Sequence, residues 1–323
     1  MKEFWYKGAP QLIGKTSKSI IHPFVFKKYR GLAINPYQGC AHRCAYCYAT
    51  YHWSPEFYDK IYAKINAPEI LDKQLATWKS DTIGPVMVGS ATDAYQPAEV
   101  RYGLARRCIK VLQKHNVPYY VFTKSVVILR DLTLHADYRD KCAIIWSITT
   151  ANERLRRIIE PGTPPTSRLF ETMNQFSNKG LICGVNIDPI IPLVTDSAEE
   201  LRSVAKACAA AGVRHVFGSV LRIRSDIWKR MMIVLEYLGP ANWRERYGSI
   251  YNLTGDITSA YGNANPEYDQ MIRHRLHEQL RFLGLKPSFP NRIVRREIKR
   301  ARLGQSSLQD YDLKPAAPPL IAS

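Results

Sequence analysis

Short apolar runs alternate with amphipathic stretches along most of the chain. The apolar runs are rich in β-branched and aromatic residues, which is typical of buried parallel strands. They cover residues 31–34, 84–89, 117–123, 142–148, 181–187 and 213–220. The stretches between them predict helices over residues 68–79, 98–115, 125–135, 165–179, 197–211 and 225–238. Ser197 is a favourable helix N-cap, and Gly180 and Gly212 are favourable helix ends.

Each of the six predicted strands is followed by a helix. Six βα units with right-handed crossovers build either an open doubly wound sheet or a partly closed barrel. In both arrangements ligands bind at the carboxyl ends of the strands. Polar residues follow the predicted strands at that edge, among them Ser90, Asp93, Lys124 and Thr149.

The hydrophobic pattern changes at both ends of the chain. The first residues have little clear period and are expected to form an extension that wraps the domain. After Asn263, Pro266 opens a predicted helix with an apolar stripe, and a basic segment follows it. Pro, Ala and Ser dominate the end of the chain, which we expect to be disordered. The predicted divisions are residues 1–30, 31–240, 241–303 and 304–323.

The chain of 323 residues carries a formal net charge of +18. Such a charge favours a polyanionic partner, and nucleic acid is the first candidate. A basic proteome or a solubility requirement would produce the same charge. Ten Lys and Arg residues lie between Arg273 and Arg302, where Glu278 and Glu297 are the only acidic residues.

No run of about 18 apolar residues is present, so we expect no membrane span. The first residues also lack the apolar core of a signal peptide. We therefore expect a cytoplasmic protein, in which thiols stay reduced. Four cysteines scattered among apolar neighbours are expected to be structural: Cys108, Cys142, Cys183 and Cys208.

The other three cysteines, Cys40, Cys44 and Cys47, lie at C-x3-C-x2-C spacing after the first predicted strand. They fit a 4Fe–4S cluster held by three thiolates, which leaves one iron open for chemistry. A structural zinc ion and three unrelated core cysteines are the alternatives. Zinc sites usually pair one knuckle with a second, which is missing here, and the loop is too polar for a core. The histidines close enough in sequence to complete a zinc site are His22, His42 and His52.

With Tyr46 before its last cysteine, this loop resembles the signature of the radical S-adenosylmethionine enzymes. Asn35–Cys40 and Cys44–Ala49 resemble more specifically the spore photoproduct lyase-like branch of that superfamily. Further segments that resemble this branch are spread over about residues 15–240. They are Thr92–Glu99, Thr123–Ser125, Arg130–Asp131, Ser147–Thr150, Glu160–Pro161, Arg168–Leu169, and Pro189–Pro192 with Asp196.

The resemblance implies an α/β fold with a six-stranded partial (β/α)6 TIM-type barrel. It also implies that Cys40, Cys44 and Cys47 hold three irons of a 4Fe–4S cluster and that S-adenosylmethionine chelates the fourth. An electron from a flavodoxin- or ferredoxin-type donor then breaks the sulfonium C–S bond. The resulting 5′-deoxyadenosyl radical takes a hydrogen atom from the substrate.

The resemblance also assigns residues to the methionyl end of the cofactor. Thr92 or Asp93 is expected to contact the amino group, and Lys124 the carboxylate. A helix cap and a solvated lysine are the structural alternatives. Glu160 and Arg168 either form an ion pair or face the substrate.

At the nucleoside end, Ser147 and Asn186 are expected to bind the ribose, and Tyr46 to flank the adenine. A small core residue at Ser147 and a tyrosine that packs the loop are the alternatives for this group.

One position departs from the lyase pattern. Tyr48 matches a tyrosine beside the cluster that takes part in hydrogen transfer, whereas Ser90 stands where the lyase has a hydrogen-donating cysteine. A serine O–H bond is too strong for that role. We therefore expect a radical enzyme whose reaction differs from that of the lyase, with Tyr48 and Ser90 at its catalytic centre. Its substrate is unidentified, and nucleic acid is the first candidate. The alternatives are a peptide or metabolite substrate, and a metal-stapled nucleic-acid-binding protein without catalysis.

Overall fold

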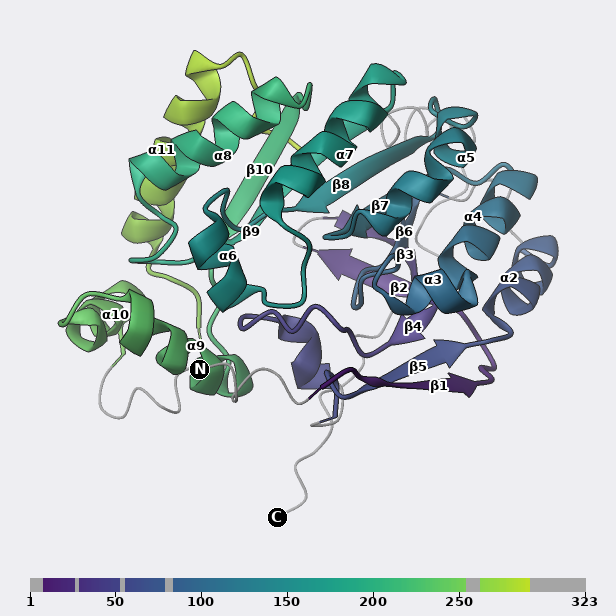
Figure 1. The fold of residues 1–323 in the computed structure, drawn as a ribbon, viewed down its shortest axis with the longest axis horizontal. Coiled ribbons are helices and arrows are strands. Elements are labelled where there is room, and N and C mark those ends of the chain that lie inside the picture. The colour runs from purple at the N-terminus through teal and green to yellow at the C-terminus, as the bar shows by residue number, and fades with distance from the viewer. Residues whose placement is uncertain (1–7, 27–28, 53–55, 79–83, 254–261, 291–323) are drawn as a thin grey trace.

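A computed structural model describes residues 8–26, 29–52, 56–78, 84–253 and 262–290 (Figure 1). The predicted basic segment Arg292–Arg302 and the predicted tail at 304–323 lie outside the described residues.

Within the described ranges the larger sheet has seven strands, in the order β10-β9-β8-β7-β6-β3-β2. All neighbours from β3 to β10 are parallel, and β2 pairs with β3 in the antiparallel sense. Because strand order follows chain order, each crossover leads to the adjacent strand. The strands are β2 (Ile21–Phe26), β3 (Tyr29–Ile34), β6 (Val86–Val88), β7 (Tyr119–Thr123), β8 (Cys142–Ser147), β9 (Ile182–Ile190) and β10 (His215–Val220).

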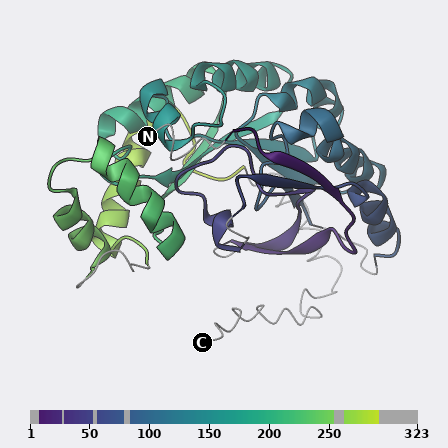
Figure 2. The ribbon, with the colours of Figure 1, turned by 60° about the horizontal axis from the view of Figure 1, so that its bottom comes forward.

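Helices follow one another in an arc along one side of this sheet, as the blue-to-green ribbons of Figure 2 show. The predicted alternation of strands and helices in an α/β fold is thereby confirmed, while closure into a six-stranded partial barrel stays a prediction. The helices are α2 (Ala67–Ala76), α3 (Ala98–Tyr102), α4 (Leu104–Lys114), α5 (Leu132–Ala136), α6 (Glu153–Ile159), α7 (Thr166–Asn178), α8 (Ala198–Ala210), α9 (Ser225–Leu238), α10 (Trp243–Tyr251) and α11 (Pro266–Phe282).

A smaller sheet consists of β1 (Gln11–Lys15), β5 (Lys60–Lys64) and β4 (Tyr37–Gln38), in the order β1-β5-β4. Part of the expected N-terminal extension is therefore strand: β1 belongs to this sheet and β2 to the larger one. Tyr37 of β4 is fully buried, and its hydroxyl donates a hydrogen bond to the buried carboxylate of Glu99. The cysteine loop therefore leaves the small sheet at β4 and the chain returns to it at β5.

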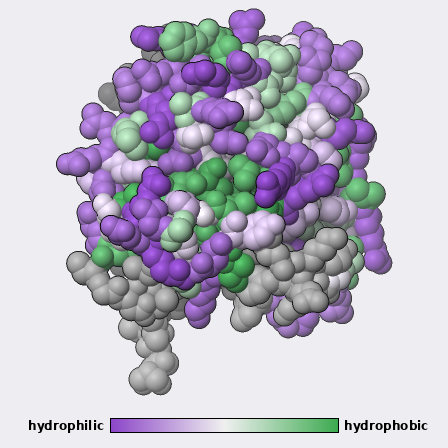
Figure 3. All heavy atoms as spheres, turned by 60° about the vertical axis from the view of Figure 1, so that its left-hand side comes forward, coloured by the Kyte–Doolittle hydropathy of each residue, from purple (hydrophilic) through white to green (hydrophobic). Residues whose placement is uncertain are grey.

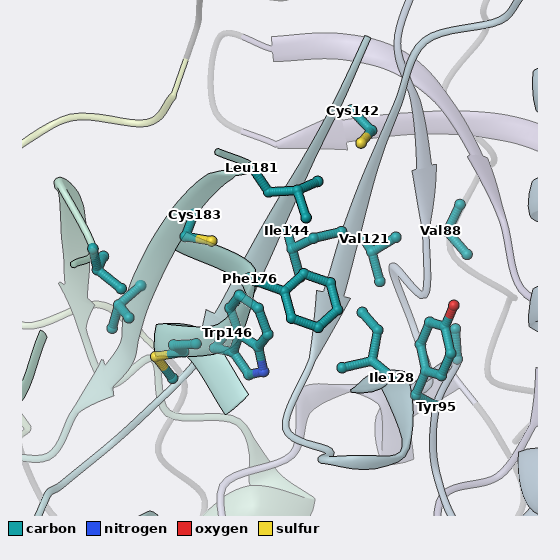
Figure 4. Close-up of a cluster of buried hydrophobic side chains, with 14 of the residues drawn as sticks. Val88, Tyr95, Val121, Ile128, Cys142, Ile144, Trp146, Phe176, Leu181 and Cys183 are labelled. Atoms are coloured by element: carbon teal, nitrogen blue, oxygen red, sulfur yellow. The ribbon is translucent and has the colours of Figure 1, made fainter. Parts of the chain in front are cut away.

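Side chains alternate between the two faces of the parallel strands, as the pleat requires. On the helix side, Ile144 and Trp146 of β8 join Val121 of β7 in the main core (Figure 4). The ring of Trp146 meets Phe176 of α7 edge to face, with 5.3 Å between centroids. The four cysteines expected to be structural, Cys108, Cys142, Cys183 and Cys208, are free and buried in this core, as predicted.

Two predicted helices are divided in the structure. The 98–115 segment forms α3 and α4 because Gly103, with a φ of 61°, turns the chain between them. The 125–135 segment begins with a 3-10 turn, η2 (Val127–Asp131), before α5. The Ser125 hydroxyl accepts the Val127 N–H at 3.1 Å, which competes with regular helical pairing.

An aromatic cluster covers the other face of the sheet. Phe289, which follows α11, lies 4.8 Å from Tyr120 and 5.4 Å from Phe217 between ring centroids, and stacks on Phe122 at 6.3 Å. Pro290 accepts a hydrogen bond from the Tyr120 hydroxyl at 3.4 Å. The end of the described chain is therefore held against β7 and β10.

Hydrophilic residues cover most of the face seen in Figure 3, and apolar residues gather near its centre and along its top. No helix in the described part of the chain is both long and apolar enough to cross a membrane.

The aromatic cluster gives a stability prediction. Phe289→Ala should lower the free energy of unfolding by about 2 kcal/mol, because this half-buried ring packs against three aromatic residues and alanine cannot. Phe282→Ala is the matched control, since that side chain is 75% exposed and should change stability by less than about 0.5 kcal/mol. Urea unfolding of both variants measures the difference, and equal decreases would contradict it.

Candidate active site

The cysteine loop runs from β4 to the 3-10 helix η1 (Tyr48–His52). It begins tightly against β5: Gly39 has a φ of 87°, and a Cβ there would lie 2.3 Å from the Lys60 carbonyl oxygen. The Cys40 N–H donates to the Phe57 carbonyl at 3.0 Å. Only glycine allows both this backbone conformation and this close approach.

The segment after α6 holds the opposite side of the loop. The Ala45 N–H donates to Ile159 O at 2.8 Å, and the Gly162 N–H donates to His42 O at 3.0 Å. A Cβ on Gly162 would lie 2.2 Å from Ala41 O, so the two backbones are in direct contact.

Gln96 holds the loop from a third direction. Its amide nitrogen donates to Gly39 O at 2.9 Å, and its amide oxygen accepts the Ala41 N–H at 3.0 Å. The side chain is fully buried. The two residues that flank Cys40 are therefore bound by one amide group, which fixes the direction of that cysteine.

The three thiols of this loop lie in one shielded environment. Cys40 and Cys44 are buried, and Cys47 is partly exposed. Burial raises the pKa of Cys40 to about 12 and also raises the pKa values of Cys44 and Cys47. Each thiol interacts electrostatically with another of the three. A bound metal must therefore replace their protons.

The donor set fits a cluster better than a single ion. No three His, Cys, Asp or Glu residues in the described ranges are arranged to hold one metal ion. Both ring nitrogens of His42 are in use, toward Asp93 and Gly162 O, and those of His22 contact Ile20 O and Asn35. The side chain of His52 lies outside the described part. Thiolates that ligate different irons need not converge on one point, so the three cysteines suit a 4Fe–4S cluster.

Asp93, expected at the methionyl amino group, is bound by protein groups on both oxygens. One oxygen accepts from the Tyr95 N–H and the Thr123 hydroxyl, each at 2.8 Å. The other accepts from the Lys124 N–H at 2.6 Å and contacts His42 Nε2 at 2.9 Å. Burial alone would raise the pKa of this carboxyl, but His42 and the N–H donors lower it overall. Asp93 is therefore a charged link between the cysteine loop and the strand ends.

The neighbouring residues of the same loop occupy different positions. The buried Thr92 hydroxyl donates to Tyr37 O at 3.2 Å. Ser90 Oγ accepts from the Asn35 amide at 3.0 Å, and the Ser90 carbonyl accepts from the Tyr48 hydroxyl. Tyr48 is 52% exposed. The structure thus brings Ser90 and Tyr48 together, beside the cysteine loop.

Lys124 belongs to a buried polar network. Its Nζ lies 3.0 Å from both the Glu160 carboxylate and the Ser147 carbonyl, and 5.5 Å from the centroid of the Tyr46 ring. The Tyr46 hydroxyl donates to Glu160 and contacts the Thr149 hydroxyl at 2.8 Å. Burial opposes both charges, yet their attraction prevails: the pKa of Lys124 is raised and that of Glu160 is lowered.

This network excludes one of the two alternatives left open for Glu160 and Arg168. Glu160 pairs with Lys124, whereas Arg168 pairs with Glu171 at 3.4 Å on the surface of α7. Glu160 and Arg168 therefore do not form an ion pair with each other.

The two expected ribose ligands are register partners, Ser147 on β8 and Asn186 on β9. Asn186 is 9% exposed. Within the described ranges neither side chain has a hydrogen-bond partner. Ser147 is the last residue of β8, and Asn186 is in the middle of the longer strand β9.

Several residues of the site were not predicted from the sequence. Gln96 carries no periodic or motif signal of its own, although it lies in a segment that resembles the lyase branch. Tyr58, whose hydroxyl donates to Cys44 O at 2.6 Å, gave no signal. Arg230 of α9 donates to Ala45 O and Cys47 O across more than 180 residues of sequence, which local patterns cannot reveal.

The family model of the Radical SAM superfamily matches residues 34–205. The chain therefore belongs to this superfamily, as its cysteine motif predicted. Membership implies an iron–sulfur cluster and S-adenosylmethionine as cofactors, and in general a reductant. The expected likeness to spore photoproduct lyase is confirmed at the level of the fold.

Spore photoproduct lyase complexed with dinucleoside spore photoproduct superposes with a TM-score of 0.63 at 12% identity, over 85% of this chain and 80% of that one. A radical SAM methyltransferase from Sphaerobacter thermophilus gives a TM-score of 0.53 at 14% identity, over 82% and 67%. An uncharacterized protein of Mycobacterium tuberculosis is 28% identical over 83% of this chain and 81% of its own length. An uncharacterized protein of Acidianus two-tailed virus is 28% identical over 63% and 74%.

The buried Lys124–Glu160 pair gives a prediction on stability and pH. Lys124→Met leaves a buried carboxylate without its partner and should cost about 3–5 kcal/mol at pH 7. Loss of the cation raises the folded-state pKa of Glu160 above its unfolded value, so the folded variant binds a proton more readily. Its deficit relative to wild type should therefore shrink as the pH falls from 7 to 5.

Urea unfolding at several pH values measures this deficit. Adding Glu160→Gln to Lys124→Met should recover part of the missing stability. Arg168→Met removes an exposed ion pair and should change stability by less than about 0.5 kcal/mol. A pH-independent deficit at Lys124 would show that Glu160 is not the group left unpaired.

Proposed function

We propose that this chain is a radical S-adenosylmethionine enzyme in which Cys40, Cys44 and Cys47 ligate three irons of a 4Fe–4S cluster. The observation that carries the proposal is the cysteine loop itself. The segment that carries the three thiols is held by backbone hydrogen bonds with Phe57, Ile159 and Gly162 and by the side-chain amide of Gln96. The loop lies inside the segment that matches the family model.

When bound, the cluster and S-adenosylmethionine supply one-electron cleavage of the sulfonium and a radical that takes a hydrogen atom from the substrate. The protein must hold these groups, exclude water and direct the reaction. Burial of Cys40 and Cys44 supports the second of these tasks.

The methionyl carboxylate would bind Lys124, whose ammonium group Glu160 and the Ser147 carbonyl already hold in place. The Thr92 hydroxyl can still accept a hydrogen bond from the methionyl amino group while it donates to Tyr37 O. Asp93 has its oxygens bound by protein groups, so we assign it a positioning role for the loop rather than direct contact with the cofactor.

The nucleoside end of the cofactor would lie over β8 and β9. Ser147 and Asn186 are adjacent across these strands and lack protein partners among the described residues, so both can bond the ribose hydroxyls. Tyr46 is fixed through its hydroxyl by Thr149 and Glu160, which leaves its ring as the group that could flank the adenine. The parallel strands of the larger sheet would form the six-stranded partial barrel expected of the family.

At the catalytic centre, Tyr48 and Ser90 form one unit through the bond from the tyrosine hydroxyl to the Ser90 carbonyl. The Ser90 hydroxyl is itself held by Asn35. Ser90 stands where the lyase has a hydrogen-donating cysteine. The last step of this reaction should therefore differ from that of lesion repair.

Nucleic acid is the leading substrate class because the net charge is +18. The lyase structures of similar fold, which contain a dinucleoside photoproduct, agree with this choice. A flavodoxin- or ferredoxin-type protein would supply the electron.

The cluster is tested directly. Protein purified without oxygen should contain about four irons and four sulfides per chain. With dithionite it should convert S-adenosylmethionine to 5′-deoxyadenosine and methionine. Cys40→Ala, Cys44→Ala and Cys47→Ala should each lose most of the iron, whereas Cys108→Ala removes a core thiol and should keep it. Wild-type protein that stays colourless after reconstitution with iron and sulfide but binds zinc would contradict the proposal.

The nucleic-acid substrate is tested by salt-dependent binding. A chain ending at Pro290 lacks the basic segment Arg292–Arg302 but keeps Phe289, whereas a chain ending at Gly304 keeps both. The shorter chain should bind nucleic acid more weakly. Its salt dependence should be flatter, by about 0.9 in the log–log slope for each phosphate that the basic segment would neutralise.

Gel-shift titrations with duplex DNA, single-stranded DNA and transfer RNA at two salt concentrations compare the two chains. Both should still assemble the cluster. Should neither chain bind any of these at low salt, a peptide or metabolite takes the place of nucleic acid as the substrate.

A further inference from the structure

The cysteine loop has a cationic contact that comes from the far end of the parallel sheet. Arg230 lies on α9, which follows the last strand, β10. Its Nε donates to Ala45 O at 2.8 Å, and its Nη2 donates to Cys47 O at 3.1 Å and to the Thr50 hydroxyl at 2.9 Å. One guanidinium thus binds the backbone on both sides of Tyr46.

The guanidinium of Arg230 is itself held in position. Its side chain is 15% exposed, and Asp226, one turn earlier on α9, lies 3.5 Å away. The ring of Tyr58 lies 5.8 Å from the guanidinium carbon, and the Tyr58 hydroxyl donates to Cys44 O at 2.6 Å. A planar guanidinium fork that donates to two carbonyl oxygens cannot be replaced by an ammonium without loss of geometry.

The position of this charge has a consequence for a cluster bound at the loop. The guanidinium of Arg230 is hydrogen-bonded to the carbonyl oxygen of Cys47, one of the three residues proposed to ligate the cluster. A cluster gains one negative charge on reduction, and a fixed cation nearby stabilises that reduced form. Groups that orient metal ligands from outside also control how firmly the metal is held.

We propose that Arg230 is a positioning residue for the iron–sulfur centre, one that both retains the cluster and raises its reduction potential. This inference rests on the proposed function, because it assumes the cluster at Cys40, Cys44 and Cys47. It assigns to α9 a task in the chemistry, beyond covering the end of the sheet.

The test compares the reconstituted full-length wild type with Arg230→Gln, Arg230→Lys and Arg244→Gln. Arg244 is the matched control, an arginine on α10 that is 59% exposed and paired with Glu236. Two properties are measured: the midpoint potential, by redox titration followed with electron paramagnetic resonance, and the rate of iron release to a chelator. Circular dichroism checks that each variant is folded.

Arg230→Gln should have a lower midpoint potential than wild type and release iron about 10-fold faster or more. Arg230→Lys keeps the charge but loses the fork, so its potential should stay close to wild type while its iron release is accelerated. Arg244→Gln should match wild type in both. If Arg230→Gln does not fold, the iron release of Arg230→Lys decides.

The two failures are distinguishable. A wild-type protein that takes up no iron overturns the proposed function and this inference with it. If the wild type holds a cluster, two results overturn the inference alone. One is that Arg230→Gln has the same midpoint potential and iron release as the wild type. The other is that Arg230→Lys has the same iron release as the wild type.

Discussion

The arrangement of the site depends on one buried carboxylate. Asp93 accepts hydrogen bonds from Tyr95, Thr123 and Lys124 and contacts His42, so it joins the loop after β6, the end of β7 and the cysteine loop. Its four polar partners offset the cost of burying a charge, which is large for an unpaired ion. Without Asp93, His42 and the Lys124 N–H would lose a buried partner together, and the cysteine loop would lose a link to the sheet.

Most of the parallel sheet could be predicted from the sequence because buried parallel strands are continuously apolar. β7 and β8 are such runs. Shorter elements gave no comparable signal. β4 has two residues, which pair with β5, and α6 has seven, too few to show a helical period.

The site was predictable where chemistry requires a fixed spacing in sequence and less so where it requires a spatial neighbour. The three cysteines lie within one short loop, and Ser147 could be placed at a strand end. Asn186 was expected near a strand end too, but β9 continues to Ile190 and Asn186 lies in its middle. The partner of Lys124 could not be known, since Glu160 arrives from the end of another helix. The same holds for Asp93: its place after a strand predicted a partner for an ammonium group, and only the structure shows its four protein partners.

The origin of Arg230 in the last βα unit has a consequence for the order in which the protein is made. Ala45 is 185 residues ahead of Arg230 in the chain. At a synthesis rate of about 5–20 residues per second, roughly 10–40 s separate their emergence from the ribosome. During that interval the nascent chain carries the three thiols, but its cysteine loop lacks the hydrogen bonds from Arg230. The cysteine loop is thus translated well before the arginine that completes its hydrogen bonds.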